Sequence, residues 1–136
     1  MEEDKKNTRK GFQMYNATAH NIYAQNNVAV ESPAKLIEML YEGVLRFNAQ
    51  AKRSIEDGNI EKKVYWINRS TAVIAELIAV LDMNAGAVSA YLNGLYTREI
   101  QLLVEANIEN NTQKVDECSN VFKTLLEAWR ETTNVD

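Results

Sequence analysis

The sequence has few of the residues that interrupt helices or build covalent and metal sites. Among its 136 residues are one cysteine, one proline, one histidine and five glycines. A single cysteine excludes an internal disulfide framework and a cysteine-rich metal site, which favours a reducing compartment such as the cytoplasm. A single histidine excludes a di-iron helical bundle, because that site takes Glu-x-x-His motifs from two helices.

Long hydrophobic runs and an excess of positive charge are also missing. No stretch reaches the roughly 18 continuous apolar residues that a membrane-spanning helix needs, and the charged start MEEDKKNTRK lacks the apolar core of a signal peptide. The net charge is −4, and the lysines and arginines are interspersed with acidic residues. We therefore expect no membrane insertion and no nucleic-acid partner.

Apolar residues recur with helical spacing through most of the chain. Ser32 and Pro33 begin the first helical segment, because serine caps early backbone N–H groups and proline fits the first turn. Short connections predict that consecutive helices lie antiparallel, so the expected fold is all-α, an antiparallel up-and-down four-helix bundle. The spacing predicts helices over about 33–57, 60–82, 86–108 and 112–133.

The chain divides into a bundle domain, 32–136, and two segments that precede it. We expect residues 1–13 to be a flexible tail, with Met14 as a candidate native start. Residues 14–31 are expected to form a short N-terminal cap segment or helix that must dock on the bundle to be ordered. Its predicted apolar anchors are Ile22 and Tyr23.

The second and third predicted helices carry more apolar surface than one core-facing stripe requires. Their apolar arcs span roughly 200° or more, beyond the ~100° stripe that usually faces a core. Two interpretations stay open: a groove for a helical partner, or two helices that are simply more central, with the N-terminal segment lying over them. Both hold in turn if the segment that contains Tyr23 occupies the groove until a partner displaces it. The residues that we expect to contact the partner are Trp66, Val73, Leu77, Val80, Tyr96, Ile100, Leu103 and Val104.

No arrangement of reactive residues indicates an enzyme, a cofactor or a metal. The glycines stand singly, so there is no phosphate-binding loop, and no Cys/His pair could form a nucleophile. Cys118 falls on the core stripe of the fourth helix and is expected to be a small buried hydrophobe. Glu99 is expected to pair with a basic residue or to lie at the groove edge. Trp66 and Trp129 are expected to anchor the core or helix seams.

Four stretches of the chain, in order, resemble the flagellin-specific export chaperone family FliS. The resemblance runs from about Tyr15 to Trp129 and includes the Ser-Pro start and the Leu-Tyr-Glu-Gly of the first helix. The stretches are VESPAKLIEMLYEGVLRF, INRSTAVIAELIAVLD, LNGLYTREIQLLVEANIEN and LLEAWRE.

The resemblance implies a cytoplasmic chaperone of flagellar type III export that binds the disordered C-terminal segment of flagellin. The flagellin segment would lay helical pieces on the hydrophobic surface of the later helices, without nucleotide or metal. The chaperone would keep this client unpolymerised and present it to the export gate, and a co-chaperone or regulator is a further candidate partner.

Tyr23 matches a tyrosine of the family's N-terminal segment, which is implied to dock on the client surface when the client is absent. His20 stands where family members often carry a second tyrosine. The alternative to this function is a non-enzymatic helical adaptor that acts through self-association or another protein partner.

Overall fold

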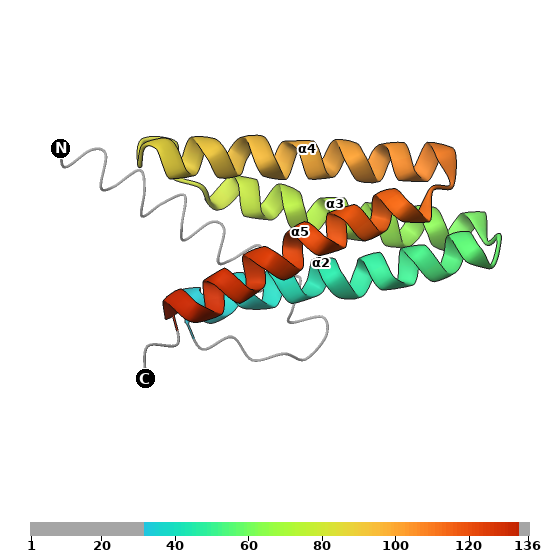
Figure 1. Ribbon diagram of the computed structural model, residues 1–136, viewed down its shortest axis with the longest axis horizontal. Coiled ribbons are helices and arrows are strands. Elements are labelled where there is room, and N and C mark those ends of the chain that lie inside the picture. Colours follow the sequence, from blue (N-terminus) through green and yellow to red (C-terminus); the bar gives the residue numbers. More distant parts are fainter. Residues whose placement is uncertain (1–31, 134–136) are drawn as a thin grey trace.

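The computed structural model describes residues 32–133, which form four long helices (Figure 1). The predicted all-α four-helix bundle is confirmed, and each predicted helix end lies within two residues of the observed one. The predicted tail, 1–13, and the cap segment with Ile22 and Tyr23 lie outside the described residues. The helices are α2 Pro33–Glu56, α3 Ile60–Val80, α4 Ala87–Glu109 and α5 Thr112–Thr133.

Capping side chains and left-handed residues determine where the helices begin and end. The Ser32 hydroxyl accepts a hydrogen bond from the backbone N–H of Lys35 at 3.1 Å, which caps α2 as the sequence predicts. Asn59 caps α3 in the same way. Gly58 and Asn110 adopt positive φ angles of 68° and 53°, so the chain reverses after α2 and after α4.

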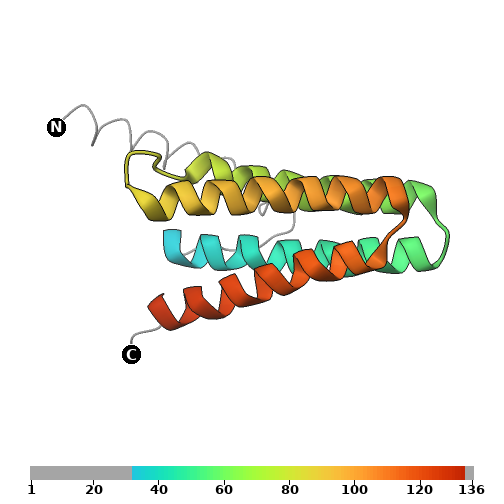
Figure 2. The ribbon, with the colours of Figure 1, turned by 45° about the horizontal axis from the view of Figure 1, so that its top comes forward.

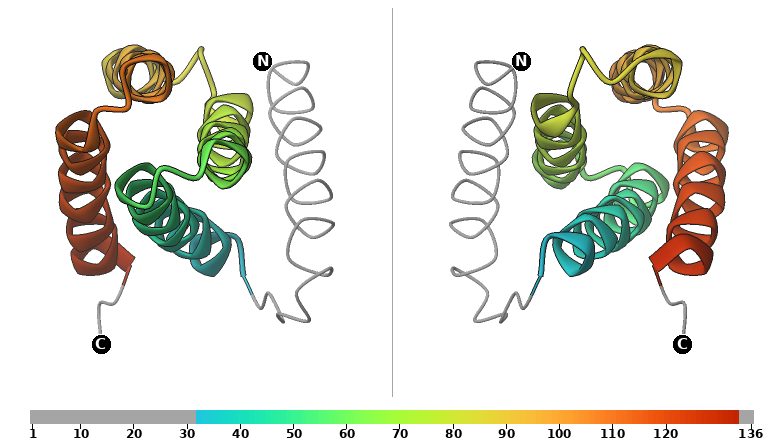
Figure 3. Two further views of the ribbon diagram at one scale, coloured as in Figure 1. Left: turned by 90° about the vertical axis from the view of Figure 1, so that its right-hand side faces the viewer. Right: turned by 90° about the vertical axis from the view of Figure 1, so that its left-hand side faces the viewer.

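The helices form a ring when the bundle is viewed from its ends (Figure 3). α2 packs against α3 and α5, and α4 packs against the same two helices from the opposite corner. α5 tilts away from α4 toward its C-terminal end (Figure 2), so these two helices meet mainly near the turn that joins them. The core therefore lies inside the ring and each helix buries a face between two neighbours.

Phe122 of α5 lies at the centre of this core and is fully buried. Its ring contacts those of Tyr41 on α2 and Tyr96 on α4, with centroids 5.9 and 6.1 Å away. The hydroxyl groups of the two tyrosines hydrogen-bond to each other at 2.6 Å, so neither phenol is left unpaired in the core. Three helices are thus joined through one aromatic cluster.

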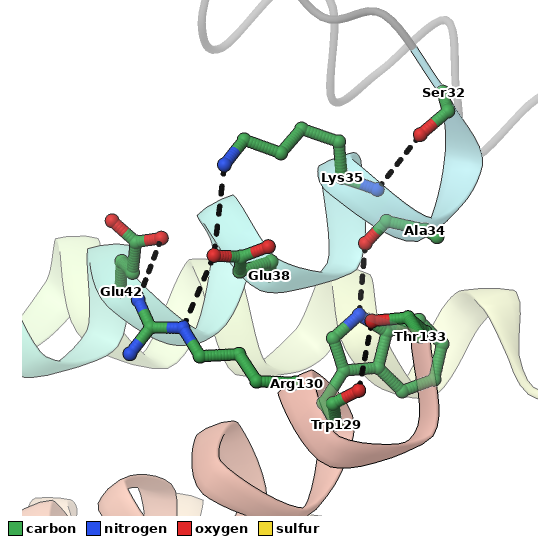
Figure 4. A network of polar contacts seen from close by, with 8 residues as sticks. All are labelled: Ser32, Ala34, Lys35, Glu38, Glu42, Trp129, Arg130 and Thr133. Carbon is green, nitrogen blue, oxygen red and sulfur yellow. Dashed lines mark hydrogen bonds and ion pairs between the residues drawn. The ribbon is translucent and has the colours of Figure 1, made fainter. Parts of the chain in front are cut away.

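Trp129 fastens the end of α5 to the beginning of α2 (Figure 4). Its indole N–H donates to the backbone carbonyl of Ala34 at 2.8 Å, and its ring packs edge-on against Tyr41. Arg130 donates to the carboxylates of Glu38 and Glu42 at 3.1 and 3.4 Å. The prediction that Trp129 anchors a helix seam is confirmed.

Phe122→Ala should lower the free energy of unfolding by about 3–5 kcal/mol, because it leaves a cavity between two tyrosine rings. Urea denaturation followed by circular dichroism measures this loss. Tyr91→Ala is the matched control, since Tyr91 is 68% exposed and its removal should cost less than about 0.5 kcal/mol. Equal losses in both variants would contradict the central place of Phe122.

Candidate protein-binding surface

Four of the eight residues predicted to contact a partner are buried in the bundle core. Val73 and Tyr96 are each 2% exposed, Leu77 is 1% exposed and Leu103 is fully buried. These side chains therefore do not line an open groove in this structure, and their contact with a partner stays a prediction. They form part of the packing that holds the bundle together.

The wide apolar arcs of α3 and α4 arise because each helix packs between two neighbours in the ring. Residues seven apart share one face of a helix, so Val73 lies on the face that carries Trp66. The Trp66 ring stacks on Phe47 of α2 with centroids 5.7 Å apart, so that face meets α2 and Trp66 anchors a seam as predicted. Central packing, one of the two open interpretations, accounts for the buried residues.

The other four predicted residues have more access to solvent. Trp66, Val80 and Ile100 are half-buried and pack against the core from outside. Val104 is 45% exposed. Contact between any of these four and a partner stays a prediction, and Val104 has the most surface to offer.

Exposed apolar side chains gather on the outer edge where α3 begins and α4 ends. Lys63 links the two helices at this level, because its ammonium donates to the carbonyl oxygen of Asn107 at 2.8 Å. Along the sequence, Ile60 and Val64 flank Lys63 on α3, and Val104 and Ile108 flank Asn107 on α4. These four aliphatic residues are between 37% and 76% exposed. We call Ile60, Val64, Val104 and Ile108 the α3–α4 patch.

The helical spacing of Ile60, Val64 and Ile67 favours a single buried stripe, yet the structure buries only Ile67. A step of three residues leaves two positions about 60° apart around the helix, so Val64 lies well to one side of Ile67. Ile60 stands in the first turn, where the neighbouring helices no longer cover it. The wheel of one helix cannot show where its neighbours end. For that reason sequence reasoning found only Val104 of this patch and missed the other three residues.

A cluster of aromatic rings and arginines covers the seam between α2 and α3. The Arg69 guanidinium lies 4.9 Å from the centre of the Phe47 ring and donates to the Tyr65 hydroxyl at 3.1 Å. Arg46 approaches the same phenylalanine at 5.2 Å. These contacts hold the exposed face of the seam in one arrangement and give it a positive charge.

A chain of buried polar groups crosses the core near the middle of the bundle. Asn48 of α2 accepts a hydrogen bond from the Ser70 hydroxyl at 2.6 Å and donates to Ser119 at 3.2 Å. Cys118 beside it is fully buried, and burial raises the pKa of its thiol to about 12. The prediction that Cys118 is a small buried hydrophobe is confirmed, because a neutral thiol at pH 7 is a poor nucleophile.

Glu99 of α4 is 1% exposed, and one of its carboxylate oxygens, Oε1, has no hydrogen-bond partner. Burial raises the pKa of this carboxyl, and the charge of Glu117 adds to the shift, while Arg98 opposes it. No ion pair joins Glu99 to a basic residue in the part of the chain that the structure describes. The expectation of a basic partner or a groove-edge position is therefore wrong.

Residues 32–133 contain neither the side-chain grouping of a metal site nor the apolar helix of a membrane span. Within 32–133, no three His, Cys, Asp or Glu side chains come close enough together to hold a metal ion. No helix in the same range combines the length and the apolar character needed to cross a membrane. His20 lies outside the described residues.

The family described as flagellar protein FliS matches residues 14–136. The chain belongs to the FliS family. A flagellar secretion chaperone FliS of Campylobacter jejuni is 57% identical over 122 residues, covering 89% of this chain and 95% of that protein. Proteins of the same name from Salmonella typhimurium and Bacillus subtilis are 32% and 31% identical, covering 87% and 82% of this chain and 92% and 84% of theirs.

Membership of the FliS family confirms the resemblance found in the sequence. The matched range takes in all four described helices, so the α3–α4 patch and the seam cluster both lie within the part of the chain that defines the family. The relatives match at nearly full length, so the likeness concerns the whole bundle and not a short motif.

Glu99→Gln should make this FliS-family bundle more stable at neutral pH. The folded-state pKa of Glu99 is raised, so the folded protein binds the proton more tightly than the unfolded chain and the wild type loses stability as pH rises above the ordinary glutamate pKa. Glutamine does not titrate, so the variant should lack this loss and gain about 1 kcal/mol or more above pH ~7.

Urea denaturation at a series of pH values measures the difference between Glu99→Gln and the wild type. Glu127→Gln is the control, because Glu127 is exposed and its removal should leave the pH dependence unchanged. Lower stability of Glu99→Gln at every pH would show that the hydrogen bonds of the carboxyl outweigh the cost of burying its charge.

Proposed function

We propose that this chain is a cytoplasmic chaperone of flagellar export that binds the disordered C-terminal segment of flagellin, keeps it from polymerising and presents it to an export-gate component. The single observation that carries the proposal is the α3–α4 patch on a bundle of the FliS family. The relatives are named flagellar secretion chaperones, which supports the same role. Such a chaperone acts by binding alone and needs no catalytic residue, cofactor or metal.

The α3–α4 patch suits an amphipathic helix. Ile60 and Val64 are four residues apart on α3, as are Val104 and Ile108 on α4, so each pair stands one turn apart along its helix. Burying an exposed aliphatic side chain contributes about 1.5–3 kcal/mol. Four such contacts can offset part of the free energy that a disordered client loses when it becomes ordered.

The eight residues predicted from sequence take unequal parts in this proposal. Val104 would contact flagellin directly, and Trp66, Val80 and Ile100 would do so at the margins of the bound segment. The four buried residues would hold the backbones of α3 and α4 in place beneath the client. The contacts of Ile22 and Tyr23 with the same surface, as a cap that the client displaces, remain part of the proposal.

Ile108→Asp and Val104→Asp should each weaken binding of a flagellin C-terminal peptide at least about tenfold, because a charge replaces an apolar contact. Both side chains are exposed, so the helical content should stay at the wild-type level. Calorimetric titration measures the affinity and circular dichroism the helicity. Gln101→Asp, an exposed position on the same helix, is the matched control and should bind normally.

Val73→Asp separates a binding defect from a folding defect. Val73 is 2% exposed, so an aspartate there would bury an unpaired charge and should unfold the bundle, with a loss on the order of 3–5 kcal/mol. Normal affinity in both Ile108→Asp and Val104→Asp would remove the α3–α4 patch from the proposal. Absence of any peptide binding to the folded wild type would leave the adaptor function, which light scattering tests through self-association.

A further inference from the structure

The α2–α3 and α4–α5 turns lie at the same end of the bundle (Figure 1). Residues at these turns line a hollow of about 260 Å³. It is smaller than the roughly 300–1,000 Å³ typical of sites for drug-sized ligands, so it has room for about one amino-acid residue. Ile60 belongs both to this hollow and to the α3–α4 patch, which makes the two surfaces continuous. The lining residues are Ser54, Ile55, Gly58, Asn59, Ile60, Lys63 and Asn110.

Lys63 brings a buried positive charge to the hollow. The residue is 7% exposed, and its ammonium donates to the Asn107 carbonyl at 2.8 Å and to the Asn110 side-chain oxygen at 2.7 Å. An ammonium has three donors, so these two bonds leave one available. No carboxylate of the described residues forms an ion pair with Lys63. A buried ammonium without an anionic partner favours a ligand that carries negative charge.

The beginning of α3 adds to the attraction for an anion at the same place. Asn59 lines the hollow and occupies the N-terminal capping position of α3. Its side chain and carbonyl accept from the backbone N–H groups of Lys62 and Lys63. The amides of Ile60 and Glu61 precede these and have no partner within a helix, so they remain as donors at the positive end of the helix dipole.

Ile55 and Ile60 add apolar surface to the lining, so the ligand that fits best combines a negative charge with an apolar group in the space of about one residue. The last residue of a polypeptide combines both groups, because its α-carboxylate and its side chain are attached to the same Cα atom. An internal aspartate or glutamate would need the chain to continue in both directions past the two turns that border the hollow. The chemistry therefore favours a chain terminus over an acidic side chain.

We propose that the hollow captures the C-terminal α-carboxylate of the flagellin segment, with Lys63 as the charged donor and Ile55 and Ile60 against the terminal side chain. The inference rests on the proposed function, and it determines the direction of the client: its last residue lies at the turn end of the bundle, and the preceding helix lies along the α3–α4 patch.

The test is calorimetric titration of two synthetic flagellin C-terminal peptides, one with a free carboxylate and one with a C-terminal amide, against the full-length wild type and Lys63→Met. Amidation should weaken binding to the wild type about tenfold or more, because it removes a charge-assisted contact. The Lys63→Met variant should bind the free-acid peptide about as much more weakly as amidation weakens binding to the wild type. Its affinities for the two peptides should lie within about twofold of each other.

Lys62→Met is the matched control, because Lys62 is an exposed lysine on the neighbouring position and its loss should leave the effect of amidation unchanged. The comparison of the two peptides on the wild type needs no variant. It therefore tests whether the terminal carboxylate is bound even if Lys63→Met fails to fold. Equal binding of both peptides to the wild type would overturn the capture of the terminus while leaving the proposed function intact.

Two further results would also count against the terminal carboxylate. If Lys63→Met weakened both peptides equally while amidation had no effect on the wild type, Lys63 would contact an acidic side chain. If neither peptide bound the folded wild type, the proposed function itself would fail, and the inference with it.

Discussion

The rest of the structure depends on the aromatic cluster that Phe122 forms with Tyr41 and Tyr96. A ring of four helices has a wide centre, and this centre must be filled without leaving polar atoms unpaired. Phe122 fills it from α5, and the two phenols that flank the ring satisfy each other by a hydrogen bond of 2.6 Å. Because this cluster fixes α4 against α2 and α5, and the stack of Trp66 on Phe47 fixes α3 against α2, both α3 and α4 can leave their outer edge outside the core.

The separation between a filled centre and an open edge explains where the bundle can bind a partner. The α2–α3 seam is closed by the stack of Trp66 on Phe47 and by Arg69 above it. The seam between the beginning of α2 and the end of α5 is closed by Trp129 and the Arg130 ion pairs. The beginning of α3 and the end of α4 are joined instead by Lys63, a hydrogen-bonded link that leaves the aliphatic side chains around it uncovered.

The sequence predicts the elements of this fold far better than it predicts the binding surface. Helix ends are local properties, since the Ser32 cap and the left-handed Gly58 depend on residues within one turn. Burial depends on neighbours that are distant in the sequence. Val73 and Ile60 are both apolar residues at helical spacing in the sequence. In the structure, α2 covers the face of α3 that carries Val73, while Ile60 is left exposed. Glu99 shows the same limit, because only the packed bundle reveals that it forms no ion pair within residues 32–133 and that Oε1 lacks a hydrogen-bond partner.

Exposure of four aliphatic residues carries a cost that a chaperone of this kind must manage. An apolar patch favours association with any complementary surface, including a second copy of the chain. Charge at the edge of the patch limits this promiscuity, because a partner that brings only apolar groups leaves the Lys63 ammonium and the first amides of α3 without an anion. In the proposed complex, apolar area would supply affinity, while the buried cation and the helix dipole at one end would select the direction in which the flagellin segment lies.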